Sequence, residues 1–160
     1  MVKLTIDGIQ VEAEKGTSIL HAAESVGIEV PTLCYIKDLL PDGSCRMCMV
    51  EIENRGRTKM ETACTAQVGE GLVVTTNSEK VRNARRNVLD MLLSNHKTDC
   101  FSCRANGDCK LQELCFEYGI ERTTYSGEQT ELPIDDSNKF FTYNPNLCIL
   151  CHRCVNTCHK

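Results

Sequence analysis

The sequence is poor in the residues that build a large apolar core. It contains no tryptophan, aromatic residues make up 5% of its 160 positions, and hydrophobic residues make up 41%. A chain of this length can hold one ordinary domain or a few small ones, and small domains often depend on bound metal for stability. We therefore expect metal-stabilised sub-domains rather than one large apolar core.

Several signatures of function and location are also missing. No apolar run is long enough to span a bilayer, and the N-terminus lacks the apolar core of a signal peptide. The net charge of −4 provides no basic surface for nucleic acid. We find no glycine-rich motif for dinucleotides or phosphates and no Ser/His/Asp arrangement. The sequence therefore predicts a soluble, cytoplasmic protein with no nucleic-acid partner, no membrane insertion and no catalytic substrate site of its own.

Cysteine, in contrast, is abundant. The chain has 12 cysteines, and several of them stand in Cys-x2-Cys units. Such units are typical of metal binding, and thiols stay reduced in a cytoplasm. We therefore interpret the cysteines as metal ligands rather than disulfide partners, and all but Cys115 fall into three groups.

The first group is Cys34-x10-Cys45-x2-Cys48-x15-Cys64. A remote thiol, a close pair and a later thiol are the ingredients of a plant-type [2Fe–2S] site, although the first gap is longer than the x4 of that pattern. A zinc ribbon would show two Cys-x2-Cys pairs, and only one is present. The small step Gly43-Ser44 is expected to let backbone N–H groups approach the sulfurs.

The second group is His96-x3-Cys100-x2-Cys103-x5-Cys109, which offers four ligands within fourteen residues. Four ligands suit either one zinc ion or a [4Fe–4S] cubane, and the spacing of the last three favours the cubane. A neutral imidazole in place of a fourth thiolate leaves the cluster less negative. We therefore expect a higher reduction potential than in an all-cysteine cubane.

The third group is the terminal run Cys148-x2-Cys151-x2-Cys154-x3-Cys158, the most specific pattern in the sequence. Its first three thiols suit three corners of a [4Fe–4S] cubane, and in two-cluster ferredoxins the fourth cysteine of such a run serves the other cluster. No second run is present. Three arrangements stay open: Cys158 folds back onto its own cluster, a partner donates the fourth ligand, or the chain stops short of its natural end.

Other chemistry-bearing side chains are expected to be structural. Cys115 stands among apolar residues of a short predicted helix, so we expect a buried thiol. His21 lies far from any cysteine group and is expected at the surface or half-buried. His152 and His159 interleave with the terminal cysteines, where we expect positions beside a cluster or toward solvent rather than ligation.

Three arginines mark one face of a long predicted helix, namely Arg82, Arg85 and Arg86. We interpret this face as solvated, because charged side chains on a helix surface normally lie in water. Docking of an acidic protein is the alternative.

Periodicity predicts the remaining elements. A hairpin of strands 2–6 and 9–13, followed by a helix that ends at Gly27, is the opening of a β-grasp fold. Further expected elements are strands at 49–53 and 72–76, a strand end at 62–65, a helix from a capping box at 76–79 to residue 95, and a helix at 109–118. The predicted class is α+β, with a β-grasp [2Fe–2S] ferredoxin-like domain at 1–77, a linking helix with a small His/Cys3 domain at 78–119, a linker at 120–144 and a partial bacterial-ferredoxin-like segment at 145–160.

The order of the three groups resembles one family. It is similar to the N-terminal iron–sulfur region of the large electron-transfer subunit of NADH:quinone oxidoreductase, which is shared with iron-only hydrogenases and the small diaphorase subunit of NAD-reducing hydrogenases. The segments that carry the resemblance are Gly43-Ser-Cys-Arg-Met-Cys-Met-Val-Glu51, Leu111-Gln-Glu-Leu114 and Asn146-Leu-Cys-Ile-Leu-Cys151. Two departures are that His152 stands where the family usually has glycine and that no second ferredoxin run follows.

This resemblance implies a ligand set. It assigns a [2Fe–2S] cluster to Cys34, Cys45, Cys48 and Cys64, and a [4Fe–4S] cluster to His96, Cys100, Cys103 and Cys109. It assigns three corners of another [4Fe–4S] cluster to Cys148, Cys151 and Cys154, with Cys158 directed toward a neighbouring cluster.

The resemblance also implies a function, that of an electron-transfer subunit in a soluble NAD(P)-linked, flavin-containing complex. The complex would be a hydrogenase, a transhydrogenase, a formate dehydrogenase or an electron-bifurcating enzyme, so oxidoreductase activity would belong to the complex. Implied partners are a flavin- and NAD(P)-binding iron–sulfur subunit, a thioredoxin-like [2Fe–2S] subunit, and ferredoxin or a further redox subunit. The alternatives are a free-standing multi-cluster ferredoxin and a zinc-stabilised interaction module.

Overall fold

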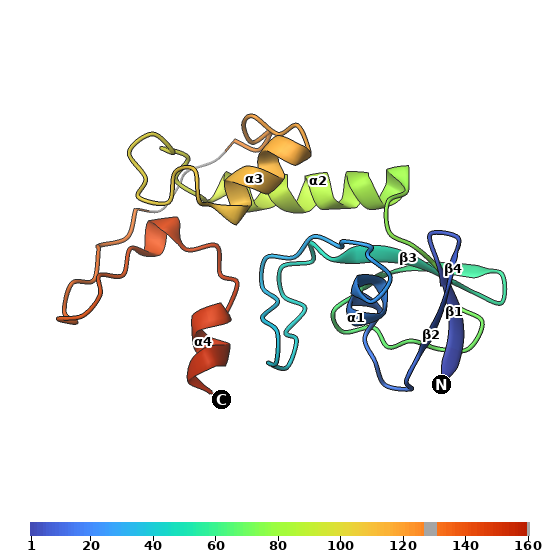
Figure 1. Ribbon diagram of the computed structural model, residues 1–160. Coiled ribbons are helices and arrows are strands. Elements are labelled where there is room, and N and C mark those ends of the chain that lie inside the picture. The colour runs from blue at the N-terminus through green and yellow to red at the C-terminus, as the bar shows by residue number, and fades with distance from the viewer. Residues whose placement is uncertain (127–130, 160) are drawn as a thin grey trace. The chain divides into compact units, whose positions relative to one another are not determined.

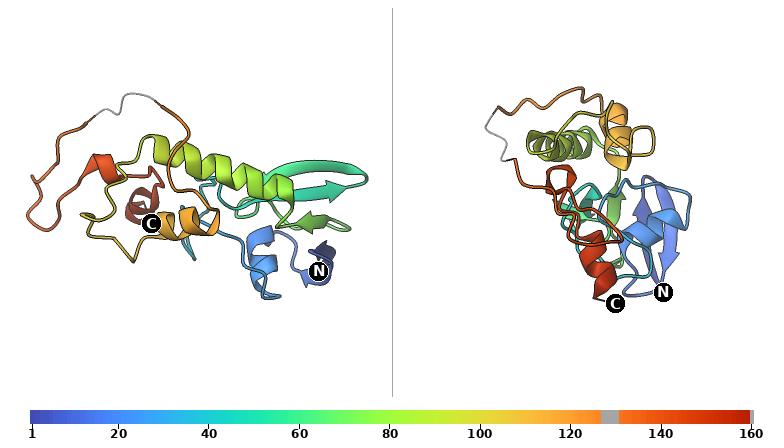
Figure 2. Two further views of the ribbon diagram at one scale, coloured as in Figure 1. Left: turned by 90° about the horizontal axis from the view of Figure 1, so that it is seen from above. Right: turned by 90° about the vertical axis from the view of Figure 1, so that its left-hand side faces the viewer.

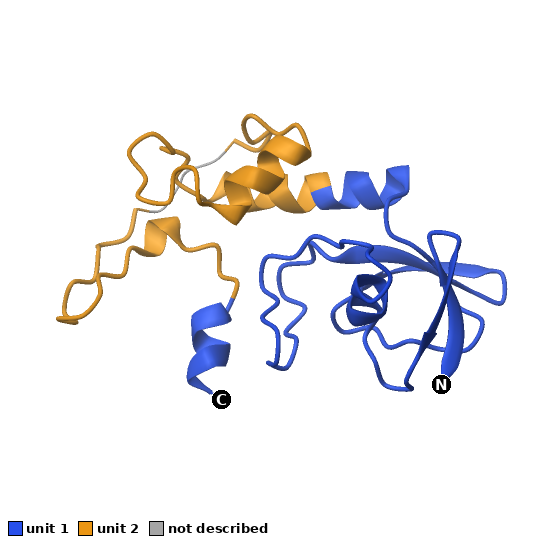
Figure 3. Ribbon diagram, viewed as in Figure 1, with its two compact units in different colours: residues 1–85, 152–160 blue, residues 86–151 orange. Residues whose placement is uncertain are grey.

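The computed structural model describes residues 1–126 and 131–159. These residues form two compact units, unit 1 with residues 1–85 and 152–159 and unit 2 with residues 86–126 and 131–151 (Figure 3). The elements, in chain order, are β1 Val2–Ile6, β2 Ile9–Ala13, α1 Ile19–Glu24, β3 Met49–Asn54, β4 Arg57–Thr62, β5 Val73–Thr75, α2 Glu79–Ser94, α3 Lys110–Glu117, the 3-10 turn η1 Pro145–Leu147, and α4 Arg153–Cys158 (Figure 1). Helix α2 begins in unit 1 and ends in unit 2.

Unit 1 is built on a five-stranded mixed sheet with the order β2-β1-β5-β3-β4. Strand β1 pairs antiparallel with β2 and parallel with β5, while β3 pairs antiparallel with both of its neighbours. The β1–β2 hairpin turns at Asp7 and Gly8, whose φ angles of 47° and 83° suit the two-residue turn that the sequence predicts. The predicted α+β class is confirmed.

Helix α1 completes the core of unit 1 and holds one of the cysteine segments. Its residues Ile19 and Leu20 are buried together with apolar side chains of the sheet. The N–H of Ile19 donates to the carbonyl of Ala66 at 2.8 Å, and the N–H of Leu20 donates to the carbonyl of Ala63 at 2.9 Å. Because the first N–H groups of a helix have no partner within it, these two bonds fix the segment that contains Cys64.

The start of α2 corrects one predicted detail. The capping residue is Ser78, whose hydroxyl accepts from the N–H of Val81 at 3.2 Å, rather than Thr76. Thr76 is instead buried, and both its N–H and its hydroxyl donate to the carboxylate of Asp7 in the β1–β2 turn. The capping box was therefore predicted two residues too early, because the long-range partner of Thr76 competes with its local role as a cap. Strand β4 was also longer than expected, since only its end had been predicted.

Arg85 contradicts the prediction of a solvated arginine face. Its side chain is 3% exposed, and its Nη2 donates to the carbonyl of Met49 at 2.8 Å and to that of Thr76 at 3.0 Å. The first turns of α2 therefore lie along β3, as Figure 2 shows. Arg82, one turn earlier, is exposed. The prediction failed because Arg85 lies four residues from both Val81 and Leu89, in the buried row of the helix.

Unit 2 joins the end of α2 to α3 and the segment that follows it. Buried leucines lie on both helices, at positions 89, 93, 111 and 114. A guanidinium N–H of Arg86 donates to the carbonyl of Tyr118, and the carboxylate of Asp90 accepts from the hydroxyl of Thr123 at 2.8 Å and from the N–H of Thr124 at 2.8 Å. The hydroxyl of Thr124 also donates to this carboxylate, and this bond, followed by the other two, lowers the pKa of Asp90. Part of the predicted linker lies outside the described residues; its described part pairs Asp135 with Tyr143. No helix in the described part of the chain has the length and apolarity needed to cross a bilayer.

We predict that Thr76→Val lowers the free energy of unfolding by about 1–2 kcal/mol, because it removes a buried hydroxyl that donates to a carboxylate. The matched control is Thr58→Val on the exposed part of β4, which should change stability by less than about 0.5 kcal/mol. The measurement is the urea unfolding midpoint of each anaerobically purified chain, followed by circular dichroism. Equal midpoints for the two variants would contradict the structural role of the Asp7–Thr76 pair.

Candidate iron–sulfur sites

The first cysteine group comes together in unit 1. The N–H of Cys34 donates to the sulfur of Cys45 at 3.4 Å, and the sulfurs of Cys48 and Cys64 lie 3.3 Å apart. Three of these thiols are buried and Cys45 is half-buried, and all four are free. An N–H group that points at a sulfur is the kind of hydrogen bond that stabilises a cluster-bound thiolate.

The electrostatics of this group reflect how closely its thiols are packed. The contact between Cys48 and Cys64 lowers the pKa of Cys48 to about 7 and raises that of Cys64, because one thiol can stabilise its neighbour's thiolate while two adjacent thiolates repel. The charges of Cys34 and Cys45 raise the pKa of Cys64 further. Burial raises the pKa of Cys45 to about 11. The four thiols therefore influence one another electrostatically, and binding of a metal would replace their protons.

The loop before Cys45 depends on one glycine. Gly43 has a φ of +65°, and a Cβ at this position would meet the Cγ2 of Thr65 at 3.1 Å. Thr65 follows Cys64, so the glycine lets two cysteine segments approach each other closely. The sequence analysis singled out the Gly43-Ser44 step for another reason, the approach of backbone N–H groups to the sulfurs.

The second group lies in unit 2. His96 comes two residues after α2, the N–H of Cys103 donates to the carbonyl of Cys100 at 3.2 Å, and Cys109 is the N-cap residue of α3. A hollow of about 460 Å³ is lined by His96, Cys100 and Cys109 among other residues, and Cys103 is not among them.

The state of His96 suits a metal ligand. Its Nδ1 is buried without a hydrogen-bond partner, and burial lowers the pKa of the ring. A neutral imidazole with an open nitrogen is the form that binds metal. The residues of this hollow therefore fit a cluster, although the described residues contain no group of three or more His, Cys, Asp or Glu side chains placed to hold a single metal ion.

Cys115 lines the same hollow. It is 8% exposed, which confirms the predicted burial, and burial together with the nearby thiols Cys109 and Cys100 raises its pKa to about 11. Its position beside the second cysteine group was missed by the sequence reasoning. Its spacing of four residues from Leu111 places both on one face of α3, but this spacing gives no sign of the nearby cysteine group.

The third group is divided between the two units. Cys148 and Cys151 belong to unit 2, whereas Cys154 and Cys158 lie on α4 in unit 1, so their shared role stays a sequence prediction. The N–H of Leu150 donates to the sulfur of Cys148 at 3.4 Å. His152 has a φ of 59°, in the left-handed region that glycine adopts most readily, which explains the glycine that the resemblance led us to expect there.

The remaining sites are consistent with structural roles. His21 is exposed, as predicted, and its ring bonds to the hydroxyl of Tyr35.

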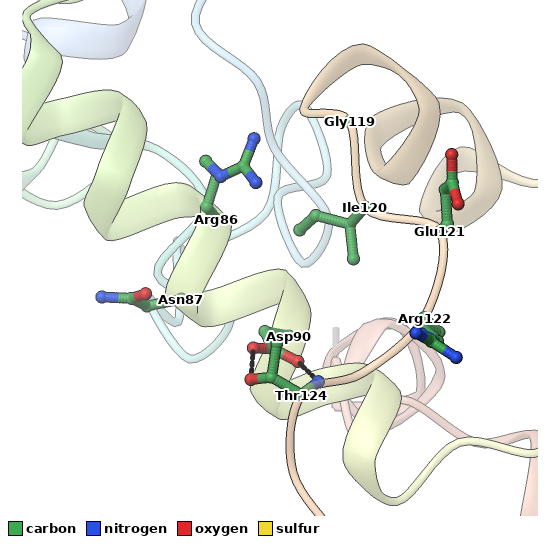
Figure 4. Close-up of a pocket in the computed structure, with 8 residues that line it drawn as sticks. All are labelled: Arg86, Asn87, Asp90, Gly119, Ile120, Glu121, Arg122 and Thr124. Carbon is green, nitrogen blue, oxygen red and sulfur yellow. Dashed lines mark hydrogen bonds between the residues drawn. The ribbon is translucent and has the colours of Figure 1, made fainter.

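A second hollow in unit 2, of about 440 Å³, is lined by no thiol (Figure 4). Its lining residues are Arg86, Asn87, Asp90, Gly119, Ile120, Glu121, Arg122 and Thr124.

Two families match the chain in the order of its sites. Residues 1–79 match the family described as 2Fe-2S iron-sulfur cluster binding domain, and residues 85–124 match the NADH-ubiquinone oxidoreductase-G iron-sulfur binding region. These matches support both predicted cluster types, [2Fe–2S] and [4Fe–4S].

Individual proteins with similar sequences agree with these two family matches. The NADPH-Fe(3+) oxidoreductase subunit alpha of Geobacter sulfurreducens is 41% identical over all of this chain and 19% of its own length. The NADP-reducing hydrogenase subunit HndD of Solidesulfovibrio fructosivorans is 38% identical over 99% of this chain and 28% of its own length. A crystal structure of NAD+-reducing [NiFe]-hydrogenase in the H2-reduced state superposes with a TM-score of 0.88 and 32% identity, covering 97% of this chain and 64% of that chain.

The chain spans about a fifth of the length of the first of these relatives. The resemblance inferred from the sequence is confirmed over both cluster regions. Residues 1–79 therefore match a family of 2Fe-2S cluster binding domains, residues 85–124 match the NADH-ubiquinone oxidoreductase-G iron-sulfur binding region, and the chain as a whole is similar to subunits of an NADPH-Fe(3+) oxidoreductase and of an NADP-reducing hydrogenase.

Proposed function

We propose that this chain is an iron–sulfur electron-transfer subunit of an NAD(P)-linked, flavin-containing oxidoreductase complex. It relays single electrons between a flavoprotein partner and a further acceptor such as ferredoxin. The observation that carries the proposal is the convergence of four free thiols in unit 1, in a chain whose second unit matches a separate iron–sulfur family.

The ligands follow the three groups. Cys34, Cys45, Cys48 and Cys64 hold a [2Fe–2S] cluster, and His96, Cys100, Cys103 and Cys109 hold a [4Fe–4S] cluster. A further [4Fe–4S] cluster is held by Cys148, Cys151 and Cys154, with Cys158 as a fourth ligand or as a ligand to a neighbouring cluster. The clusters, when bound, accept and release one electron at a time.

The protein contributes position, burial and hydrogen bonds. The N–H of Cys34 stabilises negative charge on the sulfur of Cys45, and the buried positions of Cys48 and Cys64 keep water from their sulfurs. In unit 2 the imidazole of His96 replaces one anionic ligand by a neutral one. Such differences in charge and burial give clusters within one chain different reduction potentials.

The proposed partners are redox subunits. They are a flavin- and NAD(P)-binding iron–sulfur subunit, a thioredoxin-like [2Fe–2S] subunit, and ferredoxin or a further redox subunit, all in the cytoplasm. Hydrogenase, transhydrogenase, formate dehydrogenase and electron-bifurcating complexes all accommodate such a relay. Homology to both an NADPH-Fe(3+) oxidoreductase subunit and a hydrogenase subunit supports this range.

The first prediction concerns metal content. Anaerobically purified chain should contain about ten irons with matching acid-labile sulfide if all three sites fill, or about six if the terminal site needs a partner. Iron, sulfide and zinc are measured per chain. Zinc with negligible labile sulfide would contradict the relay and identify a zinc-stabilised interaction module.

The second prediction concerns His96. His96→Cys should lower the reduction potential of the second cluster, because a thiolate adds negative charge to the ligand set. The potential is followed by redox titration of the electron paramagnetic resonance signal of that cluster. His21→Cys, at an exposed position in unit 1, serves as the control and should leave this potential unchanged. An unchanged or higher potential in His96→Cys would refute the proposed effect.

The third prediction concerns which subunit of the complex oxidises NADH or NADPH. The isolated chain should not oxidise NADH or NADPH with any dye, because it carries no dinucleotide motif. Bleaching of its visible absorbance by dithionite shows in the same sample that the clusters accept electrons. Robust NAD(P)H oxidation by the isolated chain would place the catalytic site here instead.

A further inference from the structure

Arg85 is a buried cation that the proposed relay does not yet use. Its side chain is 3% exposed, while the neighbouring Arg82 on the same helix is exposed. Taking a guanidinium out of water is costly unless polar groups surround it. The carbonyls of Met49 and Thr76 are such groups, at 2.8 and 3.0 Å from Nη2, so the charge is held in one place.

This place lies beside two of the proposed cluster ligands. Met49 directly follows Cys48, and it pairs with Thr62 across the β3–β4 ladder. The carbonyl of Cys48 accepts from the N–H of Ala63 at 2.9 Å, and Ala63 directly precedes Cys64. The guanidinium of Arg85 therefore bonds to the same end of the ladder that holds Cys48 and Cys64 with their sulfurs 3.3 Å apart.

A positive charge at this position would change the reduction potential of a cluster bound nearby. Reduction adds one negative charge to a cluster, and a fixed positive charge nearby stabilises the reduced state more than the oxidised state. Counter-ions and water weaken such an interaction much less in a buried place than at the surface. Arg82 carries the same charge in solvent, where screening is strong.

We propose that Arg85 is a positioning residue that raises the reduction potential of the [2Fe–2S] cluster. It fixes the Cys48–Cys64 end of the β3–β4 ladder and supplies a buried positive charge next to it. This inference rests on the proposed assignment of Cys34, Cys45, Cys48 and Cys64 to that cluster. Any neutral side chain at position 85 removes one positive charge from the site, whatever other partners the guanidinium has.

The test uses the anaerobically loaded full chain and four variants. Arg85→Gln and Arg85→Met remove the charge, Arg85→Lys keeps it as a compact ammonium with fewer aligned donors, and Arg82→Gln removes a charge from the exposed face of the same helix. Redox titration of the [2Fe–2S] paramagnetic signal gives the potential of each. We expect a more negative potential in both neutral Arg85 variants, a smaller shift in Arg85→Lys, and the wild-type value in Arg82→Gln.

Two results would overturn the inference. One is a potential in the neutral Arg85 variants equal to that of Arg82→Gln. The other is loss of the signal in both neutral variants with retention in Arg85→Lys and Arg82→Gln, which would make Arg85 a residue needed for folding rather than for tuning. Failure of the underlying assignment is distinguishable, because the unsubstituted chain would then contain no [2Fe–2S] signal at all.

Discussion

Cys48 and Cys64 place their sulfurs 3.3 Å apart in the interior of unit 1, and the surrounding fold keeps them there. Two sulfurs so close share one negative charge readily but disfavour a second one, unless a metal replaces both protons. Backbone hydrogen bonds next to Cys48 and Cys64 oppose the repulsion that would push two charged sulfurs apart. The β3–β4 ladder and the first N–H groups of α1 both end on the segment around Cys64, so the sheet and the helix both hold this segment in place.

Much of this arrangement was predictable from local patterns. The alternation of residues 2–13 and the Asp7-Gly8 turn predicted the first hairpin, and cysteine spacing grouped the thiols that come together in unit 1. Long-range partners were not predictable in this way. Thr76 looked like a helix cap because its bond to Asp7 joins residues 69 positions apart, and Arg85 looked solvated because its carbonyl partners lie on another element.

The two units differ in the charged and titratable side chains at their proposed cluster sites. In unit 1 three buried thiols and the half-buried Cys45 come together, and a buried guanidinium lies at the same end of the sheet. In unit 2 a histidine with a buried, open nitrogen lines a hollow that three thiols also reach. The contribution of Cys115 to that hollow could not be seen from spacing alone, because the cysteine lies beyond the ligand motif and on a helix.

Cys109 has two structural roles at once, since the proposed ligand is also the residue at which α3 begins, and its side chain makes no capping hydrogen bond. A thiolate held there places negative charge at the positive end of the helix dipole, which favours the helical state. With Cys109 as the proposed ligand, binding of a cluster would therefore favour the start of α3, and loss of that cluster would remove this contribution to the helix.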